Sequence, residues 1–281
     1  MGSGSRVRQY ERRFFEGEQA RGEKEEEAFH AVGVFGEYEV REVKGGGYEL
    51  LKNGEIIGIF SEARIEGSRV VFKLSHGMNL EISEKGVREI LTPEKTKLCG
   101  LIASDGTICK YYTKPEGKSM AHEISLRSVS YELAEAFDKL IKEIYGMTPH
   151  HYLSHHEVKG EKRQHYRVAI FSKKVAYDLW DLGIKGPEPY EFHVPFKYLD
   201  EEGKRACLRG FFSGDGQVSV YKGGSHYIRI SSSYKEGLEE LRKLLLELEF
   251  HPSEVHTYHR EVFPKNTKVL SITLIFLRRT I

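Results

Sequence analysis

Two aspartates, Asp105 and Asp215, occupy equivalent places in two matching segments of the chain, and each precedes a glycine. The segments read LCGLIASDG from Leu98 and LRGFFSGDG from Leu208. Two carboxylates held close together raise each other's pKa unless a cation neutralises them. Hard divalent cations such as Mg²⁺ prefer oxygen ligands and keep bound waters, one of which can attack a phosphate. If the two segments meet in the fold, the pair predicts metal-dependent phosphate chemistry.

The chain contains a duplicated module. Matched positions of the two segments lie 110 residues apart, and a second match, IFSKK from Ile170 and IFLRR from Ile275, lies 105 residues apart. Two matches in the same order at nearly the same offset indicate duplication rather than chance.

Both segments place a glycine inside a predicted helix, at Gly100 and Gly210. An interior glycine costs about 1 kcal/mol relative to alanine, so we expect a compensating contact. Without a side chain, two helix backbones can approach closely. Packing the helices on these glycines would bring Asp105 and Asp215 together. A single Asp-Gly pair is commonly no more than a helix end and a turn, but two copies in matched modules favour a functional pair.

The two segments resemble the duplicated signature of the LAGLIDADG homing endonucleases. The similarity covers residues 95–281, including the order of elements and a basic pair after the last strand of each half. The resemblance implies a mixed α/β (α+β) fold of two pseudo-symmetric modules. Their signature helices would form the interface, and two antiparallel sheets would form a saddle over double-stranded DNA.

The resemblance also implies an activity and its ligands. It implies a site-specific endonuclease that cuts both strands of a long asymmetric DNA target by phosphodiester hydrolysis, with Mg²⁺ as cofactor and Mn²⁺ as an accepted substitute. In that family the last acid of the signature binds the metal, which carries over to Asp105 and Asp215. A backbone carbonyl just before each acid also binds, which implies Ser104 and Gly214.

The chain departs from the family pattern in two respects. The sixth signature position, often acidic, is Ala103 in one copy and Ser213 in the other. That position is not the metal ligand in the family. The last helix of the second module is also missing from the sequence, so we expect that module to be truncated or less stable.

Hydrophobic periodicity predicts the same order of elements in both modules: helix, two strands, helix, two strands. In the first module, predicted as 93–192, these are 96–103, 107–113, 122–128, 130–145, 150–156 and 165–171, followed by a helix at 173–182. In the second module, predicted as 193–281, they are 204–212, 217–221, 227–231, 235–248, 255–260 and 269–276.

Alternation along the strands separates positions that pack under the helices from positions that face DNA. Ile124, Leu126, Val218 and Val220 are predicted to pack. The opposite faces carry Arg, Gln, Ser and Tyr, which reach base edges and phosphates. The predicted DNA contacts are Tyr111, Ser125, Arg127, Arg163, His165, Arg167, Gln217, Ser219, Tyr221, Arg229 and Ser231.

The basic pairs after the last strands offer one further catalytic candidate each, Lys173 and Arg278. Either side chain could stabilise charge on the cleaved phosphate, and solvation of a helix end is an equally good interpretation.

The run HHYLSHH from His150 to His156 does not predict a zinc site, because strand alternation divides its four histidines between two faces. A DNA-facing or solvated cluster is favoured. Cys99 and Cys207 lie on the signature helices and are expected to pack, with water as the nucleophile.

Residues 1–92 differ from the modules and are predicted to form a small α+β extension of unknown role. Asn53-Gly54 between strands 48–51 and 56–60 is a strong hairpin signal. Further strands are predicted at 69–74 and 78–82, and a charge-rich helix at 6–29. This region has 14 basic and 17 acidic residues, against 29 and 25 in the remainder, so charge alone does not indicate nucleic-acid binding.

Composition limits the class of protein. Hydrophobic residues make up 39% of the 281, which excludes global disorder, and no apolar run is long enough to span a membrane. Three cysteines cannot form a dense disulfide framework. We expect an intracellular protein, cytoplasmic or associated with a nucleoid or organelle and not secreted, that is monomeric because the duplication supplies the pseudo-dimer.

Two other functions compete with the endonuclease. A non-catalytic nucleic-acid binder on the same fold, either an intron-RNA maturase or a DNA-binding regulator, is the stronger rival, and the retention of both aspartates favours catalysis over it. A self-splicing intein is disfavoured, because the chain does not begin with Cys or Ser after a splice boundary and does not end in His-Asn.

Overall fold

A computed structural model of the chain describes residues 30–112, 120–158, 161–187, 190–220, 226–262 and 265–276. The chain divides into two compact units, Met1–Ile90 and Leu91–Ile281.

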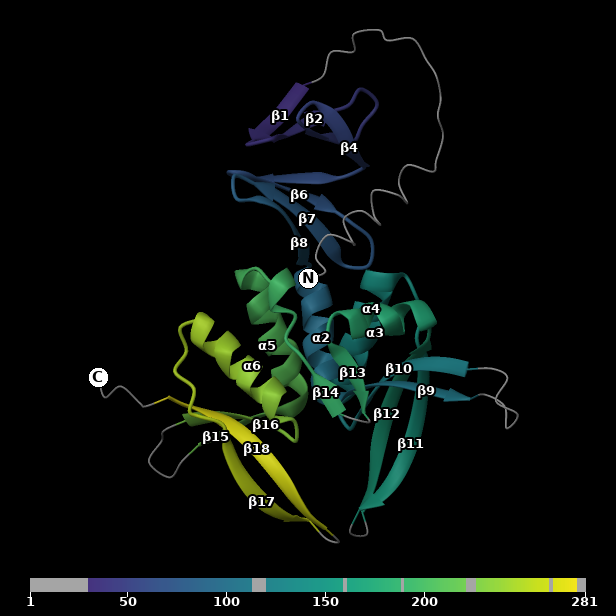
Figure 1. Cartoon of the computed structure of the whole chain (residues 1–281). Coiled ribbons are helices and arrows are strands. Elements are labelled where there is room, and N and C mark those ends of the chain that lie inside the picture. The colour runs from purple at the N-terminus through teal and green to yellow at the C-terminus, as the bar shows by residue number, and fades with distance from the viewer. Residues whose placement is uncertain are drawn as a thin grey trace. The chain divides into compact units, whose positions relative to one another are not determined.

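The described part of the first unit is built from two four-stranded sheets whose strands follow chain order (Figure 1). The first sheet contains β1 (His30–Phe35), β2 (Tyr38–Glu42), β3 (Tyr48–Lys52) and β4 (Glu55–Phe60). The second contains β5 (Ala63–Glu66), β6 (Arg69–Lys73), β7 (Met78–Ser83) and β8 (Gly86–Leu91). The four predicted strands are confirmed. Residues 30–90 contain no helix, as the sequence predicts for them, and the helix predicted at 6–29 lies outside the described residues, so the α+β character of the extension stays a prediction.

Turn chemistry and apolar alternation explain these sheets. Asn53 and Gly54 have φ of 51° and 85°, the two positive values that a type I′ hairpin turn requires. Side chains from both sheets form one core, in which the rings of Phe60 and Phe72 stack with centroids 4.2 Å apart. The predicted hairpin is therefore correct, and the two sheets stabilise each other by burying a shared apolar face.

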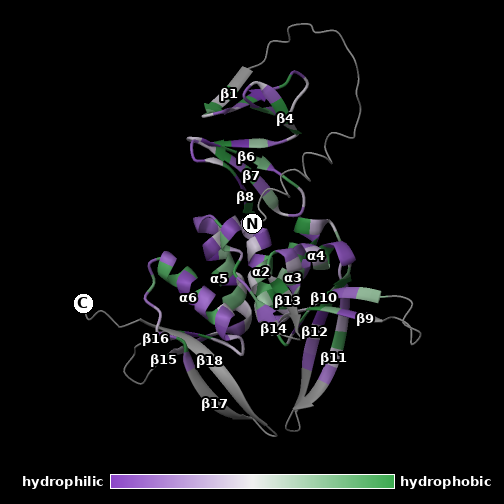
Figure 2. Ribbon diagram, in the orientation of Figure 1, coloured by the Kyte–Doolittle hydropathy of each residue, from purple (hydrophilic) through white to green (hydrophobic). Residues whose placement is uncertain are grey.

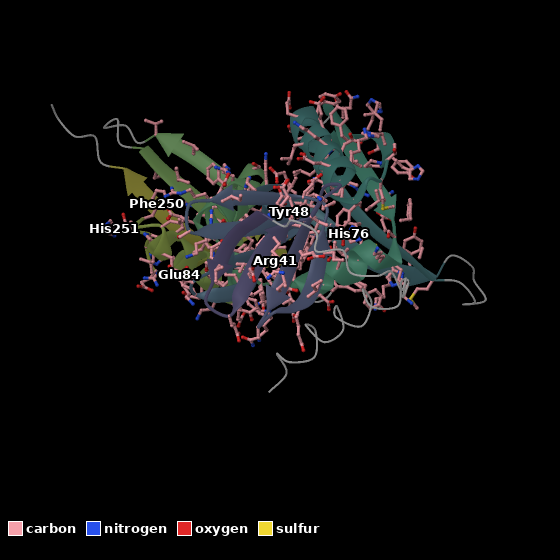
Figure 3. The ribbon with its side chains drawn as sticks, turned by 90° about the horizontal axis from the view of Figure 1, so that it is seen from above. Arg41, Tyr48, His76, Glu84, Phe250 and His251 are labelled. Carbon is pink, nitrogen blue, oxygen red and sulfur yellow. The ribbon has the colours of Figure 1, made fainter. Side chains whose placement is uncertain are left out.

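The described arginines of the first unit form ion pairs within it. Every arginine among residues 30–90 pairs with a glutamate: Arg41 with Glu39, Arg64 with Glu66, Arg69 with Glu66 and Glu81, and Arg88 with Glu81. Figure 3 labels Arg41 on β2 and Tyr48 on the neighbouring strand β3. These pairs leave the described arginines without the clustered positive charge that marks a nucleic-acid surface.

The second unit begins with the first module, whose predicted order of elements is confirmed. It contains α2 (Pro93–Asp105), β9 (Gly106–Tyr112), β10 (Met120–Ser128), α3 (Tyr131–Tyr145), β11 (His150–Val158), β12 (Glu161–Phe171) and α4 (Lys173–Asp181). The strands form an antiparallel sheet in the order β11-β12-β10-β9. Ser130 caps α3 by accepting from the Leu133 N–H, and Gly146 ends the helix with φ of 64°, as the sequence predicts.

The second module repeats this arrangement. It contains α5 (Glu201–Asp215), β15 (Gly216–Val220), β16 (His226–Ser232), α6 (Lys235–Glu247), β17 (His256–Val262) and β18 (Lys265–Phe276). Its sheet order, β15-β16-β18-β17, matches that of the first module strand for strand. Between the modules the sequence analysis missed β13 (Ile184–Pro187), β14 (Tyr190–Phe192) and the short 3₁₀ helix η1 (Phe196–Tyr198).

The helices α2 and α5 lie side by side and form the interface of the two modules (Figure 1). A Cβ added at Gly100 would lie 2.8 Å from the Phe211 backbone nitrogen and still closer to the Cys207 carbonyl oxygen. A Cβ added at Gly210 would lie 2.9 Å from the Leu101 nitrogen. The two glycines therefore permit direct backbone contact in both directions, and the predicted crossing is confirmed.

A buried lysine ties the signature helix to its own module. Lys95 is 1% exposed, forms an ion pair with Asp178 of α4, and donates to the Tyr145 hydroxyl of α3. The Tyr145 hydroxyl in turn donates to Asp178 across 2.7 Å. Since a buried charge is stable only when it is paired, this network fixes α2 against α3 and α4. Figure 2 shows hydrophobic residues, in green, on the ribbons of α2 and α3.

The helix-facing side of β15 is exposed, so the predicted packing of Val218 and Val220 is wrong. These side chains are 61% and 63% exposed, whereas Ile108, the counterpart of Val218 in the first module, is 1% exposed. In the first module α4 contacts β10 beside the edge strand β9. The described part of the second module has no counterpart of α4, which leaves both valines in solvent.

No described helix is long and apolar enough to span a membrane.

Replacing Gly100 or Gly210 with leucine should disrupt the crossing of α2 and α5. A bulky side chain would be forced onto the facing backbone, and overpacking of this kind costs about 1–3 kcal/mol or more. Thermal unfolding measures the loss. Arg209→Leu, which changes an exposed neighbour on α5, is the matched control and should leave the melting temperature nearly unchanged. Equal melting temperatures for all three variants would contradict the interface.

Candidate metal centre and nucleic-acid face

The two acids of the repeat stand at equivalent helix ends. Asp105 is the last residue of α2 and Asp215 the last of α5, and each is followed at once by a strand of its own sheet. Thr92 and Asp200 cap the opposite ends by accepting from the backbone N–H three residues later, at 3.2 Å and 2.8 Å. Both helices are thus capped at the N-terminus and place a carboxylate at the C-terminus.

The helix crossing brings these two ends into contact. A Cβ added at Gly214 would lie 2.8 Å from the Ser104 Cβ and 3.0 Å from the Asp105 Cγ. The segment before Asp215 therefore packs directly against the acid of the other module. Gly214 supplies the space that this requires, and the Ser104 hydroxyl turns back to donate to the Leu101 carbonyl across 3.0 Å.

Burial disfavours the ionised form of both carboxylates. It raises the pKa of Asp105, and burial together with the charge of Asp105 raises the pKa of Asp215 to about 7. No ion pair to either aspartate is formed among the described residues. A divalent cation between them would offset both the burial and the mutual repulsion.

The donors present suit a hard cation rather than a zinc-type site. No group of three or more His, Cys, Asp or Glu side chains that could hold a metal occurs within the described ranges. Two carboxylates can be completed by the carbonyls of Ser104 and Gly214, by water and by phosphate oxygens, which Mg²⁺ and Mn²⁺ accept. The residues therefore fit a divalent cation that is shared with a phosphate-bearing ligand.

The sequence carries a family match over both modules. A family model for a LAGLIDADG-like domain matches residues 93–180 and 202–279. The chain belongs to this LAGLIDADG-like family. No curated protein matches the sequence.

Several solved structures are similar to this LAGLIDADG-like chain. I-DmoI in complex with DNA and manganese has 19% identity and a TM-score of 0.44, over 65% of this chain and 89% of that chain. The N-terminal LAGLIDADG domain of DUF199/WhiA has 15% identity and a TM-score of 0.38, over 64% and 74%. I-LtrWI bound to its target DNA has 12% identity and a TM-score of 0.36, over 66% and 78%. The family assignment rests on the two matched sequence segments.

The first LAGLIDADG-like module presents the strand faces as alternation predicts. Ile124 and Leu126 are fully buried on the side that faces the helices. The register aligns Ser125 with Ala169 and Arg127 with Arg167, which places all four on the opposite side. Arg127 is exposed, whereas Ser125 is only 7% exposed. On this face the Arg127 side chain is therefore accessible, whereas Ser125 is covered.

Sequence reasoning missed the role of Glu123, which neutralises one of the predicted DNA contacts. Glu123 is 6% exposed and forms an ion pair with Arg167, whose guanidinium also lies 5.1 Å from the Tyr152 ring centroid. Alternation places both residues on the predicted DNA face, but only the folded structure shows that their side chains meet. Arg167 is therefore held within the sheet and is not a free cation.

The structure describes the side chains of two of the three remaining DNA-contact candidates of the first module. Tyr111 is 40% exposed and stands opposite Ala121 on the edge of the sheet. His165 is half-buried and pairs with Ser154 of β11. The side chain of Arg163 lies outside the described residues.

The second module places a polar row directly after its acid. Gln217 stands opposite Arg229, two residues beyond Asp215, and Gln217 is exposed. The Arg229 guanidinium lies 5.3 Å from the Tyr227 ring centroid, and its Nε is buried without a described partner. Ser219 and Ser231 are half-buried. Tyr221 and Arg278 lie outside the described residues.

The structure does not place Lys173 beside the acids. Val168 is level with Gly106 across the sheet, while Phe171 is level with Cys109, three residues further along. At about 3.3 Å per residue, β12 has already carried the chain roughly 10 Å outward before Lys173 is reached. The Lys173 Nζ instead lies 5.6 Å from the Tyr177 ring centroid. This position does not support the catalytic role predicted for Lys173, because β12 runs away from the acids.

The histidines and cysteines have structural roles. His151 bonds to Asp138 of α3 across 2.9 Å, and the His150 ring lies beside Phe171 on the other face, as alternation predicts. Cys99 and Cys207 are buried, and burial raises the pKa of both thiols. Neither thiol is suited to nucleophilic attack, which requires the thiolate.

Without divalent cations, the contribution of Asp215 to the free energy of unfolding should fall as pH rises from about 4 to about 7. Because the native pKa of Asp215 exceeds the ordinary 3.8, the native state binds more protons in this window, and that stability is lost as pH rises through it. Asp215→Asn should flatten the slope and raise stability at pH 8 by roughly 1–3 kcal/mol. Urea unfolding at pH 5 and pH 8 in a chelator measures both effects.

Asp138→Asn is the matched control, and its effect on stability at pH 8 should have the opposite sign. Hydrogen bonds from Lys142 and His151 lower the pKa of Asp138 despite its burial, so its ionised form stabilises the fold. This variant should lose stability at pH 8. An unchanged slope in Asp215→Asn would contradict the assigned burial of that carboxylate.

Proposed function

We propose that this protein is a site-specific, divalent-metal-dependent DNA endonuclease that cuts both strands of its target by phosphodiester hydrolysis. The proposal rests chiefly on the pairing of Asp105 with Asp215 at the crossing of α2 and α5. Two buried carboxylates without a described basic partner are costly in a protein that has no cation to place between them. Membership of the LAGLIDADG-like family supports the same function.

Each module would contribute the same set of groups. Asp105 and Asp215, with the carbonyls of Ser104 and Gly214, would hold Mg²⁺ or Mn²⁺. Such a cation polarises a phosphate and lowers the pKa of a bound water, which provides the nucleophile. The chain's own part is to fix both carboxylates at one centre through the backbone contact of Gly100 and Gly210. Because the centre has an acid from each module, one acid can serve each DNA strand.

Double-stranded DNA would lie along the sheet faces that are turned away from the helices. Arg127 of the first module and Gln217 and Arg229 of the second supply donors that reach phosphates and base edges. Because the two modules are not identical, the recognised sequence would be asymmetric. The duplication supplies both halves of the site, so the active form would be a monomer.

Cleavage of a randomised DNA library tests the function directly. Incubation with Mg²⁺ or Mn²⁺, followed by sequencing of the cut ends, should recover one long asymmetric site, and a chelator should abolish cleavage. Binding of a specific duplex without cleavage under any divalent cation would instead support the non-catalytic binder on the same fold.

Asp105→Asn or Asp215→Asn should abolish double-strand cleavage and leave DNA affinity within a few-fold of the parent. Removing one carboxylate charge empties its share of the metal centre, while the strand faces that bind DNA are untouched. Gel assays of plasmid cleavage and duplex binding measure both properties. Asp181→Asn, an exposed acid of α4, is the control and should cut normally. Full cleavage by the double Asp105→Asn, Asp215→Asn variant would refute the assignment.

Arg127→Ala should weaken duplex binding and reduce its dependence on salt. If Arg127 contacts a phosphate, the slope of log affinity against log salt falls by about one, and if it contacts a base the loss is about 1–3 kcal/mol at one position. Arg167→Ala is compared with Arg127→Ala, because loss of Arg167 also leaves the Glu123 carboxylate without the cation of its ion pair. That variant should lose both stability and affinity. A salt titration that is identical for Arg127→Ala and the parent would show that this face does not meet DNA.

A further inference from the structure

Three basic side chains gather around two aromatic rings of α4. Lys110 comes from β9, His122 from β10 and Lys173 from α4. The Lys110 Nζ lies 4.4 Å from the Trp180 ring centroid and 5.6 Å from that of Tyr177. The Lys173 Nζ lies 5.6 Å from the same Tyr177 centroid. Both ammonium groups therefore lie near one ring, and these five residues are called here the α4 basic cluster.

His122 is the buried member of the cluster and has an unsatisfied nitrogen. Its side chain is 6% exposed, and its Nε2 has no hydrogen-bond partner among the described residues. The His122 ring lies 5.7 Å from Tyr177 and 5.8 Å from Trp180 between centroids. Its carbonyl accepts from the Ser172 N–H across 3.0 Å, which joins β10 to the N-cap of α4. A buried nitrogen left unpaired is destabilising, so a partner for it would stabilise the protein.

The charges around this helix start are unbalanced. The first turn of α4 has two lysines and no acid, whereas α2, α3, α5 and α6 each have a glutamate there. Helix N-termini favour anions and disfavour cations. Within the described residues, neither Lys110 nor Lys173 forms an ion pair with a carboxylate. Burial, followed by the charges of these two lysines, lowers the pKa of His122. A bound anion would offset the positive charge that gathers at this helix start.

We propose that the α4 basic cluster binds a phosphate group. Lys110 and Lys173 are exposed and can turn their N–H groups toward it, and Nε2 of His122 can donate in the tautomer that carries its proton there. All three groups are donors, and phosphate oxygens are acceptors only. The same chemistry is offered by inorganic phosphate and by a phosphodiester of DNA that flanks the target. The site lies on the helix-facing side of the sheet, so it is separate from the acid pair and does not depend on cleavage.

Trp180 reports on this site because it is the only tryptophan in the chain. Titration of the full chain with inorganic phosphate, at constant ionic strength against chloride, should change its fluorescence in a saturable manner as Lys110 leaves the ring. Lys110→Gln and Lys173→Gln should each weaken phosphate binding about tenfold or more. Lys174→Gln, the exposed neighbour with no described ring contact in the cluster, is the matched control and should bind like the parent.

A second arm distinguishes the source of the phosphate. Duplex binding in a chelator is compared between a minimal target and one extended on the side of the first module. If DNA supplies the phosphate, the extended duplex binds more tightly and only Lys110→Gln and Lys173→Gln remove the gain. If a free anion supplies it, inorganic phosphate binds and extension makes no difference. The proposal is overturned if phosphate leaves Trp180 fluorescence unchanged and extension gives no gain, or if Lys174→Gln loses binding as much as the cluster variants.

Discussion

The close crossing of α2 and α5 is the constraint on which the second unit depends. At Gly100 and Gly210 the backbone of one helix contacts the backbone of the other, and any side chain at either position would fall on backbone atoms. Two interior glycines cost about 2 kcal/mol of helix propensity together, which burial of Leu98, Leu101 and Phe211 at the same interface offsets. The crossing fixes the relative position of the two modules, and all site geometry follows from it.

The crossing also creates the electrostatic problem that the metal would solve. It buries two carboxylates at adjoining helix ends and raises the pKa of both. The two ends are not equivalent, because Gly214 makes room for Asp105 while Ser104 occupies the corresponding position in the other copy. A duplicated motif has thus become an asymmetric pair, and we expect the two acids to differ in proton affinity and in metal affinity.

The repeated modules could be predicted from the sequence because local signals and the fold agree there. Apolar spacing gave α3 and its sheet, Ser130 and Gly146 marked the ends of that helix, and the repeated glycines indicated the crossing. The first unit was harder, since its short strands β1, β2, β5 and β8 have weak alternation and depend on tertiary packing between two sheets.

One incorrect prediction, and two that the structure does not support, depend on partners that are distant in the sequence. Val218 and Val220 have the pattern of a packed strand, but no described helix covers them. Arg167 is predicted to contact DNA, but in the fold its side chain forms an ion pair with Glu123 of the neighbouring strand. Lys173 follows a strand whose direction carries it away from the acids. Alternation predicts on which face of a strand a side chain lies. Which other residues or helices contact that side chain is determined by the whole fold.

Binding of Mn²⁺ to a Gly214→Ala variant tests the central claim most directly. The added methyl group would lie 2.8 Å from the Ser104 Cβ and 3.0 Å from the Asp105 Cγ, so it should displace the acid of the other module. Isothermal titration in the presence of target duplex should show Mn²⁺ affinity reduced about tenfold or more, as in Asp105→Asn. Ser213→Ala, which changes the exposed neighbour, should bind Mn²⁺ like the parent. Mn²⁺ affinity equal to that of the parent in both Gly214→Ala and Asp105→Asn would contradict the account.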